Sequence, residues 1–276
     1  MDVQRLAAFT YDNRGGNPAG VVLCDALPDP TRMQAVAAEV GYSETVFAAR
    51  TPEGYRVRYF APEAEIPFCG HATIALGAAL ATREGDGAFK LKLNEGEVTV
   101  EGRCGVDGLS AALVSPPTRN CPAPSHLLET ALALFGLTDA DLDPRIPPAI
   151  IDAGARHLLL AMNNRAALAA MRYDMQAGAE LMREWSLATI SLVHAETLGR
   201  FHARNPFAAG GVYEDPATGA AAAALAGYLQ ALGIEAGDLE IVQGEDMGVP
   251  CLLHAAAPTI PGGGARVQGT VRRIEG

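Results

Sequence analysis

The sequence is poor in the residues and motifs from which metal centres, disulfide frameworks and membrane spans are built. Its five cysteines include no CxxC pair, and an odd, scattered set favours thiols in a reducing compartment. No zinc, EF-hand, P-loop or dinucleotide-binding motif is present. No apolar run reaches the ~18–20 residues of a membrane-spanning helix, and no basic-then-apolar signal segment opens the sequence. We therefore expect a cytoplasmic protein with no metal, no cofactor and no membrane partner.

Basic residues are also scarce. Lysine and arginine number 21 against 32 aspartates and glutamates, which gives a formal net charge of −11. Because like charges repel, this balance argues against nucleic-acid partners and anionic membrane surfaces. Hydrophobic residues make up 49% of the chain and charged residues only 19%, so a large buried core is expected rather than disorder. The 276 residues suit two domains of roughly 100–150 residues each.

Two segments share one pattern. Residues 67–80 and 213–225 both begin with titratable side chains beside Gly or Pro and continue into an Ala-rich apolar run. Strand-like stretches, residues 89–100 and 239–249, follow in each case. A helix that is apolar nearly all round must be buried. The sequence therefore predicts an α+β protein with two pseudo-symmetric lobes, each a curved, mainly antiparallel β-sheet or barrel wrapped around a central helix.

The best linker is the proline-rich stretch 115–122, because proline disrupts both helices and central strands. We predict an N-terminal lobe of residues 1–118 and a C-terminal lobe of residues 119–263. The last strand, 264–276, could return to the first lobe. A ligand is expected in the cleft between the lobes, where two helix N-termini would hold an anion.

Four short motifs carry a resemblance to a known family. They are Gly16-Asn17-Pro18-Ala19-Gly20, Ser43-Glu44-Thr45, Cys69-Gly70-His71-Ala72-Thr73 and Glu214-Asp215-Pro216-Ala217-Thr218-Gly219. In this order and spacing they resemble the PhzF-like family of phenazine biosynthesis along the whole chain. The resemblance implies a fold like that of diaminopimelate epimerase, a homodimer, and isomerase or epimerase chemistry without a cofactor.

Glu44 is the residue expected to transfer protons. A carboxylate between a helix end and an apolar strand is partly removed from water, which suits a general acid or base. Taken alone, the motif is more typical of a solvated loop carboxylate or a helix cap, and the resemblance is what assigns proton transfer to Glu44.

His71 and Asp215 complete the predicted catalytic set. His71 lies at a helix N-terminus, which disfavours the cation, so a neutral ring that donates or accepts a hydrogen bond is expected. A buried histidine bonded to backbone is the simpler alternative. Asp215 precedes an Ala-rich run and Pro216, which is typical of an N-cap, and the resemblance also places it in the active site.

Five further positions are predicted to bind substrate: Asn17, Gly70, Thr218, Gly219 and Ala220. Many members of the family have Ser where this chain has Ala220, so its substrate is expected to differ from that of the phenazine enzyme. Related epimerases use two facing cysteines. Cys69 matches the first, but Thr218 stands at the second, so we expect Cys69 to be a small buried residue rather than a base.

These observations predict a cofactor-independent isomerase or epimerase that moves a proton between carbons of a small carboxylate metabolite. The main alternative is a non-catalytic ligand-binding or interaction protein that keeps the fold. A hydrolase with Cys69 as nucleophile and His71 as base fits poorly, because no third orienting group is evident.

Overall fold

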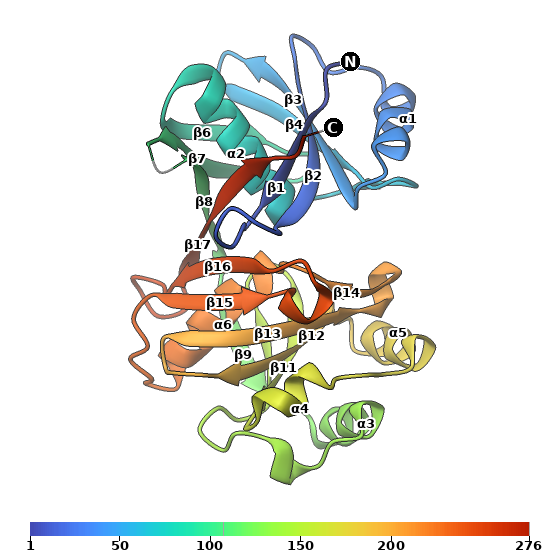
Figure 1. Cartoon of the computed structure of the whole chain (residues 1–276), viewed down its shortest axis with the longest axis vertical. Helices are drawn as coiled ribbons and strands as arrows, with labels where there is room; N and C mark the ends of the chain where they lie inside the picture. The colour runs from blue at the N-terminus through green and yellow to red at the C-terminus, as the bar shows by residue number, and fades with distance from the viewer. Residues whose placement is uncertain (107, 276) are drawn as a thin grey trace. The chain divides into compact units, whose positions relative to one another are not determined.

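The computed structural model describes residues 1–106 and 108–275 (Figure 1). It divides into two compact units: Met1–Val114 with Gln268–Gly276 form unit 1, and Ser115–Val267 form unit 2. Among the described residues, the helices are all too short or too polar to cross a lipid bilayer.

Unit 1 is a mainly antiparallel sheet with two helices. Strands β2 and β3 pair in parallel, as do β4 and β6, whereas β1–β2, β3–β4, β4–β5, β6–β7 and β7–β8 are antiparallel. The last strand of the chain, β17, returns to pair with β1. The elements are β1 (Gln4–Ala8), β2 (Asn17–Cys24), α1 (Pro30–Val40), β3 (Glu44–Thr51), β4 (Gly54–Phe60), β5 (Glu65–Ile66), α2 (Gly70–Glu84), β6 (Gly87–Lys92), β7 (Glu97–Gly105), β8 (Gly108–Pro117) and β17 (Gly264–Arg273).

Helix α2 is the centre of unit 1. It contacts β1, β2, β3, β6 and β7, and its residues from His71 to Ala81 are all buried. Small residues make this approach possible: a Cβ at Gly102 would lie 2.1 Å from the carbonyl oxygen of Gly77. The Ala-rich run in the sequence therefore reflects a helix enclosed by strands, as predicted.

Unit 2 repeats this plan with extra helices. Strands β11 and β12 pair in parallel, as do β13 and β15, whereas β9–β10, β10–β11, β12–β13, β13–β14 and β15–β16 are antiparallel. Its elements are β9 (Arg119–Pro122), α3 (Ser125–Phe135), β10 (Ala149–Asp152), β11 (Arg156–Met162), α4 (Arg165–Ala169), α5 (Met175–Glu184), β12 (Thr189–Ala195), β13 (Arg200–Phe207), β14 (Val212–Asp215), α6 (Gly219–Ala231), β15 (Leu239–Gln243) and β16 (Cys251–Ala256), with short 3-10 turns at Asp139–Asp141, Ala208–Gly210 and Glu245–Met247.

The two units share one topology. The pairings β1–β2, β2–β3, β3–β4 and β4–β6 have the same directions as β10–β11, β11–β12, β12–β13 and β13–β15, and α2 and α6 occupy matching places in the chain order. In the parallel pairs, Ala19 lies opposite Glu44, and His157 lies opposite Thr189. Thr189 thus holds in unit 2 the position that Glu44 holds in unit 1. The predicted α+β fold with a central helix in each unit is confirmed.

A large apolar cluster lies in unit 2, where α3, α4 and α5 pack on one face of β11 and β12. Leu158, Leu160 and Met162 belong to this cluster, so the alternation along β11 turns His157 and Leu159 to the opposite face. Helix α6 also contacts β11. In unit 2, one face of β11 and β12 is therefore covered by apolar side chains, whereas buried polar side chains lie on the opposite face.

Candidate active site

Three of the predicted site residues, Asn17, Glu44 and His71, meet beside Cys69 in unit 1, and secondary structure explains why. Asn17 begins β2 and Glu44 begins β3, and because these strands are parallel their first residues lie at the same edge of the sheet. Cys69 is the N-cap of α2, and His71 belongs to the first turn of that helix. Two strand starts and one helix start therefore place their side chains together.

The ring of His71 is the centre of this cluster. Its Nδ1 lies 3.3 Å from Asn17 Nδ2 and 3.3 Å from Cys69 Sγ, and its Nε2 lies 3.3 Å from Glu44 Oε2. If the amide of Asn17 donates to Nδ1, the ring proton is on Nε2 and faces the carboxylate. This arrangement suits a neutral imidazole that orients Glu44 or exchanges a proton with it.

Glu44 has an oxygen that no protein group uses. The contact between Nε2 of His71 and Oε2 of Glu44 lacks hydrogen-bond alignment, and within the described residues Oε2 is buried without a hydrogen-bond partner. The side chain of Glu44 is only 16% exposed. Buried polar atoms are nearly always satisfied, so this exception beside a histidine makes Oε2 of Glu44 a candidate functional atom.

The N-terminus of α2 adds positive potential to this cluster. Within the described part of the chain, Cys69 makes no side-chain cap bond to the helix, so no cap satisfies the first N–H groups of α2. These N–H groups carry the positive end of the helix dipole. Gly70 is the first residue of the helix, and a Cβ added there would meet nothing within 4 Å. A ligand can therefore approach the backbone closely at this point.

A second cluster surrounds Asp215 in unit 2. The hydroxyl of Thr218 donates to Asp215 Oδ2 at 2.7 Å. The buried amide of Gln243 donates to the carbonyl oxygen of Asp215 at 2.7 Å and to Thr218 Oγ1 at 3.1 Å, and it accepts from the N–H of Thr218 at 3.1 Å. Because Gln243 donates to the hydroxyl, the hydroxyl proton is left for the carboxylate. Gln243 thereby fixes the orientation of Asp215.

One local prediction is wrong. Asp215 is not the N-cap of α6, since the helix begins at Gly219 with Thr218 as its N-cap. Asp215 is instead the last residue of β14. Pro216 favours extended backbone at Asp215, and this conformation fits both an N-cap and the end of a strand, so the sequence did not distinguish the two. Gly219 and Ala220 are the first two residues of α6, and Ala220 matches His71 in the repeat.

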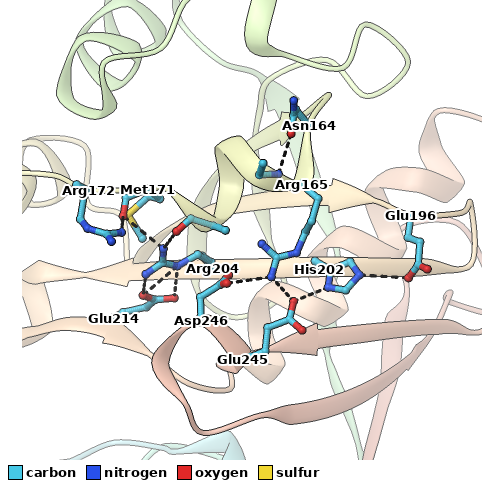
Figure 2. A network of polar contacts seen from close by, with 12 residues as sticks. Asn164, Arg165, Met171, Arg172, Glu196, His202, Arg204, Glu214, Glu245 and Asp246 are labelled. Atoms are coloured by element: carbon cyan, nitrogen blue, oxygen red, sulfur yellow. Dashed lines mark hydrogen bonds and ion pairs between the residues drawn. The ribbon is translucent and has the colours of Figure 1, made fainter.

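Glu214, the neighbour of Asp215, has a separate structural role. Its carboxylate pairs with Arg204, whose Nε and Nη2 donate to it at 3.0 and 2.6 Å (Figure 2). Both side chains are nearly inaccessible to solvent, and Nη1 of Arg204 donates to the carbonyl of Ala169 at the end of α4. Because side chains alternate between the two faces of β14, the adjacent carboxylates of Glu214 and Asp215 lie on opposite faces and have different partners.

Two buried polar residues, Gln243 and His157, were not predicted from the sequence. His157 is fully buried; its Nδ1 lies 2.7 Å from Thr189 Oγ1, and its Nε2 has no hydrogen-bond partner in residues 1–106 and 108–275. Burial lowers the pKa of His157 to about 4, so the ring is neutral in the folded protein. The places of both residues in the repeat are clear only from the fold: Gln243 ends the strand after α6, and His157 matches Ala19 of the Gly-Asn-Pro-Ala motif.

The buried ring of His157 predicts acid sensitivity. The unfolded chain protonates this histidine near its ordinary pKa of about 6.5, whereas the folded protein does so only near about 4. Stability is therefore lost as pH falls through this window. From these two values we expect His157 to account for about 2 kcal/mol of lost stability between pH 7 and about pH 5. Urea unfolding of wild type and His157→Gln at both pH values measures this. An equal pH dependence in the two proteins would contradict the assignment.

Comparison with known proteins places the chain among named relatives. A family model described as "Phenazine biosynthesis-like protein" matches residues 6–269. An uncharacterized isomerase of Mesorhizobium japonicum is 35% identical over 96% of this chain and 94% of its own length. The trans-2,3-dihydro-3-hydroxyanthranilate isomerase of Pseudomonas aeruginosa is 33% identical over 95% of this chain and 91% of its own. The crystal structure of a Bacillus anthracis phenazine biosynthesis protein of the PhzF family superposes with a TM-score of 0.85 at 22% identity, covering 100% of this chain and 98% of that one.

Proposed function

The chain belongs to the phenazine biosynthesis-like protein family of isomerases and epimerases, and from that premise we propose that it isomerises a small carboxylate metabolite by cofactor-independent proton transfer between carbons. The observation that carries this proposal is the buried, unpartnered Oε2 of Glu44, 3.3 Å from Nε2 of His71, within the described residues. A carboxylate in this position can accept a proton from carbon without first losing a hydrogen bond.

In the proposed reaction Glu44 acts as the base and then as the acid. Its carboxylate takes a proton from one carbon of the substrate, and the same group returns a proton to another carbon, so no electrons enter or leave. Negative charge develops on the substrate between these steps. The uncapped N–H groups at the start of α2 and the amide of Asn17 are suited to stabilise that charge. His71, whose Nε2 lies 3.3 Å from Oε2 of Glu44, orients the reacting groups or relays a proton.

We assign Asp215 the third catalytic role, that of orienting the substrate or relaying a proton. Its carboxylate accepts a hydrogen bond from Thr218, and Thr218 accepts one from Gln243. These bonds fix the orientation of the Asp215 carboxylate. Gly70 and Gly219, each the first residue of its helix, and Ala220 remain proposed contacts to the substrate. Ala220 has no hydroxyl to donate, which favours a substrate other than the hydroxyanthranilate named for the Pseudomonas relative.

Hydrogen exchange in heavy water tests the proposal. The protein is incubated with a panel of small carboxylates that includes trans-2,3-dihydro-3-hydroxyanthranilate, and deuterium is located by NMR and mass spectrometry. We expect at least one compound to gain deuterium at carbon, and the gain to require Glu44. A compound that binds tightly but never exchanges would support a non-catalytic binding protein instead.

Two further proposals rest on the family resemblance and the cysteine usage: the protein is a homodimer, and it acts in the cytoplasm. Light scattering at micromolar concentration checks the first, since a monomeric mass would contradict it.

A further inference from the structure

Glu44, Cys69 and His71 together offer an oxygen, a sulfur and a nitrogen that all lie within 4.8 Å of one another. We propose that these three side chains bind a zinc-like transition-metal ion, and that the bound ion inhibits the isomerase. The inhibition rests on the function proposed above, whereas the binding itself does not. The sequence contains no pattern of closely spaced metal ligands, because only the fold brings Glu44 to Cys69 and His71.

The distances suit a tetrahedral ion. Zinc bonds of about 2.0–2.1 Å to nitrogen and oxygen and about 2.3 Å to sulfur separate a nitrogen and an oxygen ligand by roughly 3.4 Å, and a sulfur and a nitrogen ligand by roughly 3.6 Å. Here Nε2 of His71 lies 3.3 Å from Glu44 Oε2 and 4.0 Å from Cys69 Sγ. The sulfur of Cys69 lies closer to Nδ1 of the same ring, at 3.3 Å, so the thiol has to turn toward Nε2 to complete the site.

The types of ligand atom determine which ions this site can bind. Magnesium and calcium prefer oxygen ligands alone, whereas one thiolate, one imidazole and one carboxylate suit zinc, cobalt and similar ions. Three protein ligands leave a fourth position open to water or a small anion, as in catalytic rather than structural zinc sites.

The surroundings of the three ligands also suit an ion. Oε2 of Glu44 is buried without a hydrogen-bond partner among the described residues, so an ion would satisfy it at no cost in existing bonds. Nδ1 of His71 lies 3.3 Å from the amide of Asn17. With an ion on Nε2, Nδ1 carries the proton, and the amide of Asn17 can turn its oxygen toward it, which fixes the ring as carbonyl groups do beside metal-bound histidines.

The dipole of α2 repels a cation at this place, but this repulsion is weaker than the attraction of the two anionic ligands. The N-terminus of α2 carries the equivalent of about +0.5 charge, whereas the thiolate of Cys69 and the carboxylate of Glu44 supply two full negative charges once the thiol has lost its proton. Binding therefore releases a proton from Cys69, and the affinity falls as the pH is lowered.

Inhibition follows from which atoms the ion occupies. The ion takes the lone pair of Glu44 that would accept a proton from substrate carbon, and it covers Nε2 of His71. An ion at this site therefore removes the base from the reaction while the fold is unchanged.

Cobalt(II) titration of the full-length protein, purified with chelator, tests the binding without any substrate. We expect one ion per chain and a near-ultraviolet thiolate-to-cobalt charge-transfer band, which zinc abolishes by displacing the cobalt. Cys69→Ser should lose the band, and Glu44→Gln should weaken binding by about 10-fold or more. Cys104→Ser, which changes an exposed thiol outside the cluster, is the matched control and should keep the band. Circular dichroism checks that each variant is folded.

The outcomes separate the two proposals. A band that persists in Cys69→Ser, or no saturable cobalt binding in the wild type, would overturn the metal site. If cobalt binds as expected, zinc should suppress deuterium exchange in wild type at the concentrations that displace cobalt. An increase of exchange with zinc would overturn the inhibition and the cofactor-independent mechanism together. Normal cobalt binding with no exchange on any compound would support the site and contradict the proposed isomerase chemistry.

Discussion

Replacing Glu44 by Gln is expected to slow turnover about 10²–10⁴-fold, which is the usual contribution of a general acid–base group. The substitution keeps the size of the side chain and an oxygen beside His71, but it removes the group that accepts the proton. Because Oε2 makes no hydrogen bond within the described residues, folding should be nearly unchanged. The measurements are deuterium exchange on the identified substrate, binding of the same compound, and urea unfolding.

Cys69→Ser is the matched control for this experiment. Cys69 lies in the same cluster, 3.3 Å from Nδ1 of His71, so it tests whether any change beside the ring is harmful. If Glu44 is the base, the serine variant should retain much of the activity. A large loss in Cys69→Ser with little loss in Glu44→Gln would mean that the chemistry is thiol-based, and the assignment of Glu44 would be wrong.

The features that the sequence revealed are local or repeated. Each Ala-rich run is apolar on all sides, so burial of α2 and α6 follows from composition alone. The internal duplication could be recognised in the sequence because both copies have the same order of helix start, helix and strand. Cys69 and His71 lie two residues apart at a helix start, so their proximity required no knowledge of the fold.

The features that the sequence did not reveal depend on strand register and strand faces. Glu44 meets His71 because α2 packs against β2 and β3, which are parallel neighbours that start at one edge, and no local pattern encodes that packing. Gln243 reaches Asp215 from the end of another strand, and a single glutamine carries no motif. The sequence also gave no sign that Glu214 and Asp215 face opposite sides of β14, because both belong to one recognised motif.

Arg204→Met is the substitution expected to cost the most stability. It leaves the carboxylate of Glu214 buried without its partner, and breaking a buried ion pair from one side typically costs about 3–5 kcal/mol. The side chains of Arg204 and Glu214, which pair in Figure 2, are only 6% and 2% exposed, and Nη1 of Arg204 also donates to the carbonyl of Ala169. Urea unfolding measures the loss, and Arg50→Met is the control, because Arg50 is 63% exposed in its pair with Glu84 and its removal should shift the midpoint little.

The double variant Arg204→Met with Glu214→Leu separates the charge from the packing. If most of the cost in the single variant comes from an uncompensated buried charge, removing both charges should recover a large part of the lost stability, since buried ion pairs can often be replaced by apolar side chains of similar volume. Asp215 is bonded through Thr218 and Gln243 rather than through Arg204, so deuterium exchange per folded molecule should survive in the double variant. A double variant no more stable than Arg204→Met would show that the bonds from Arg204 to the backbone, rather than its charge, hold this part of unit 2 together.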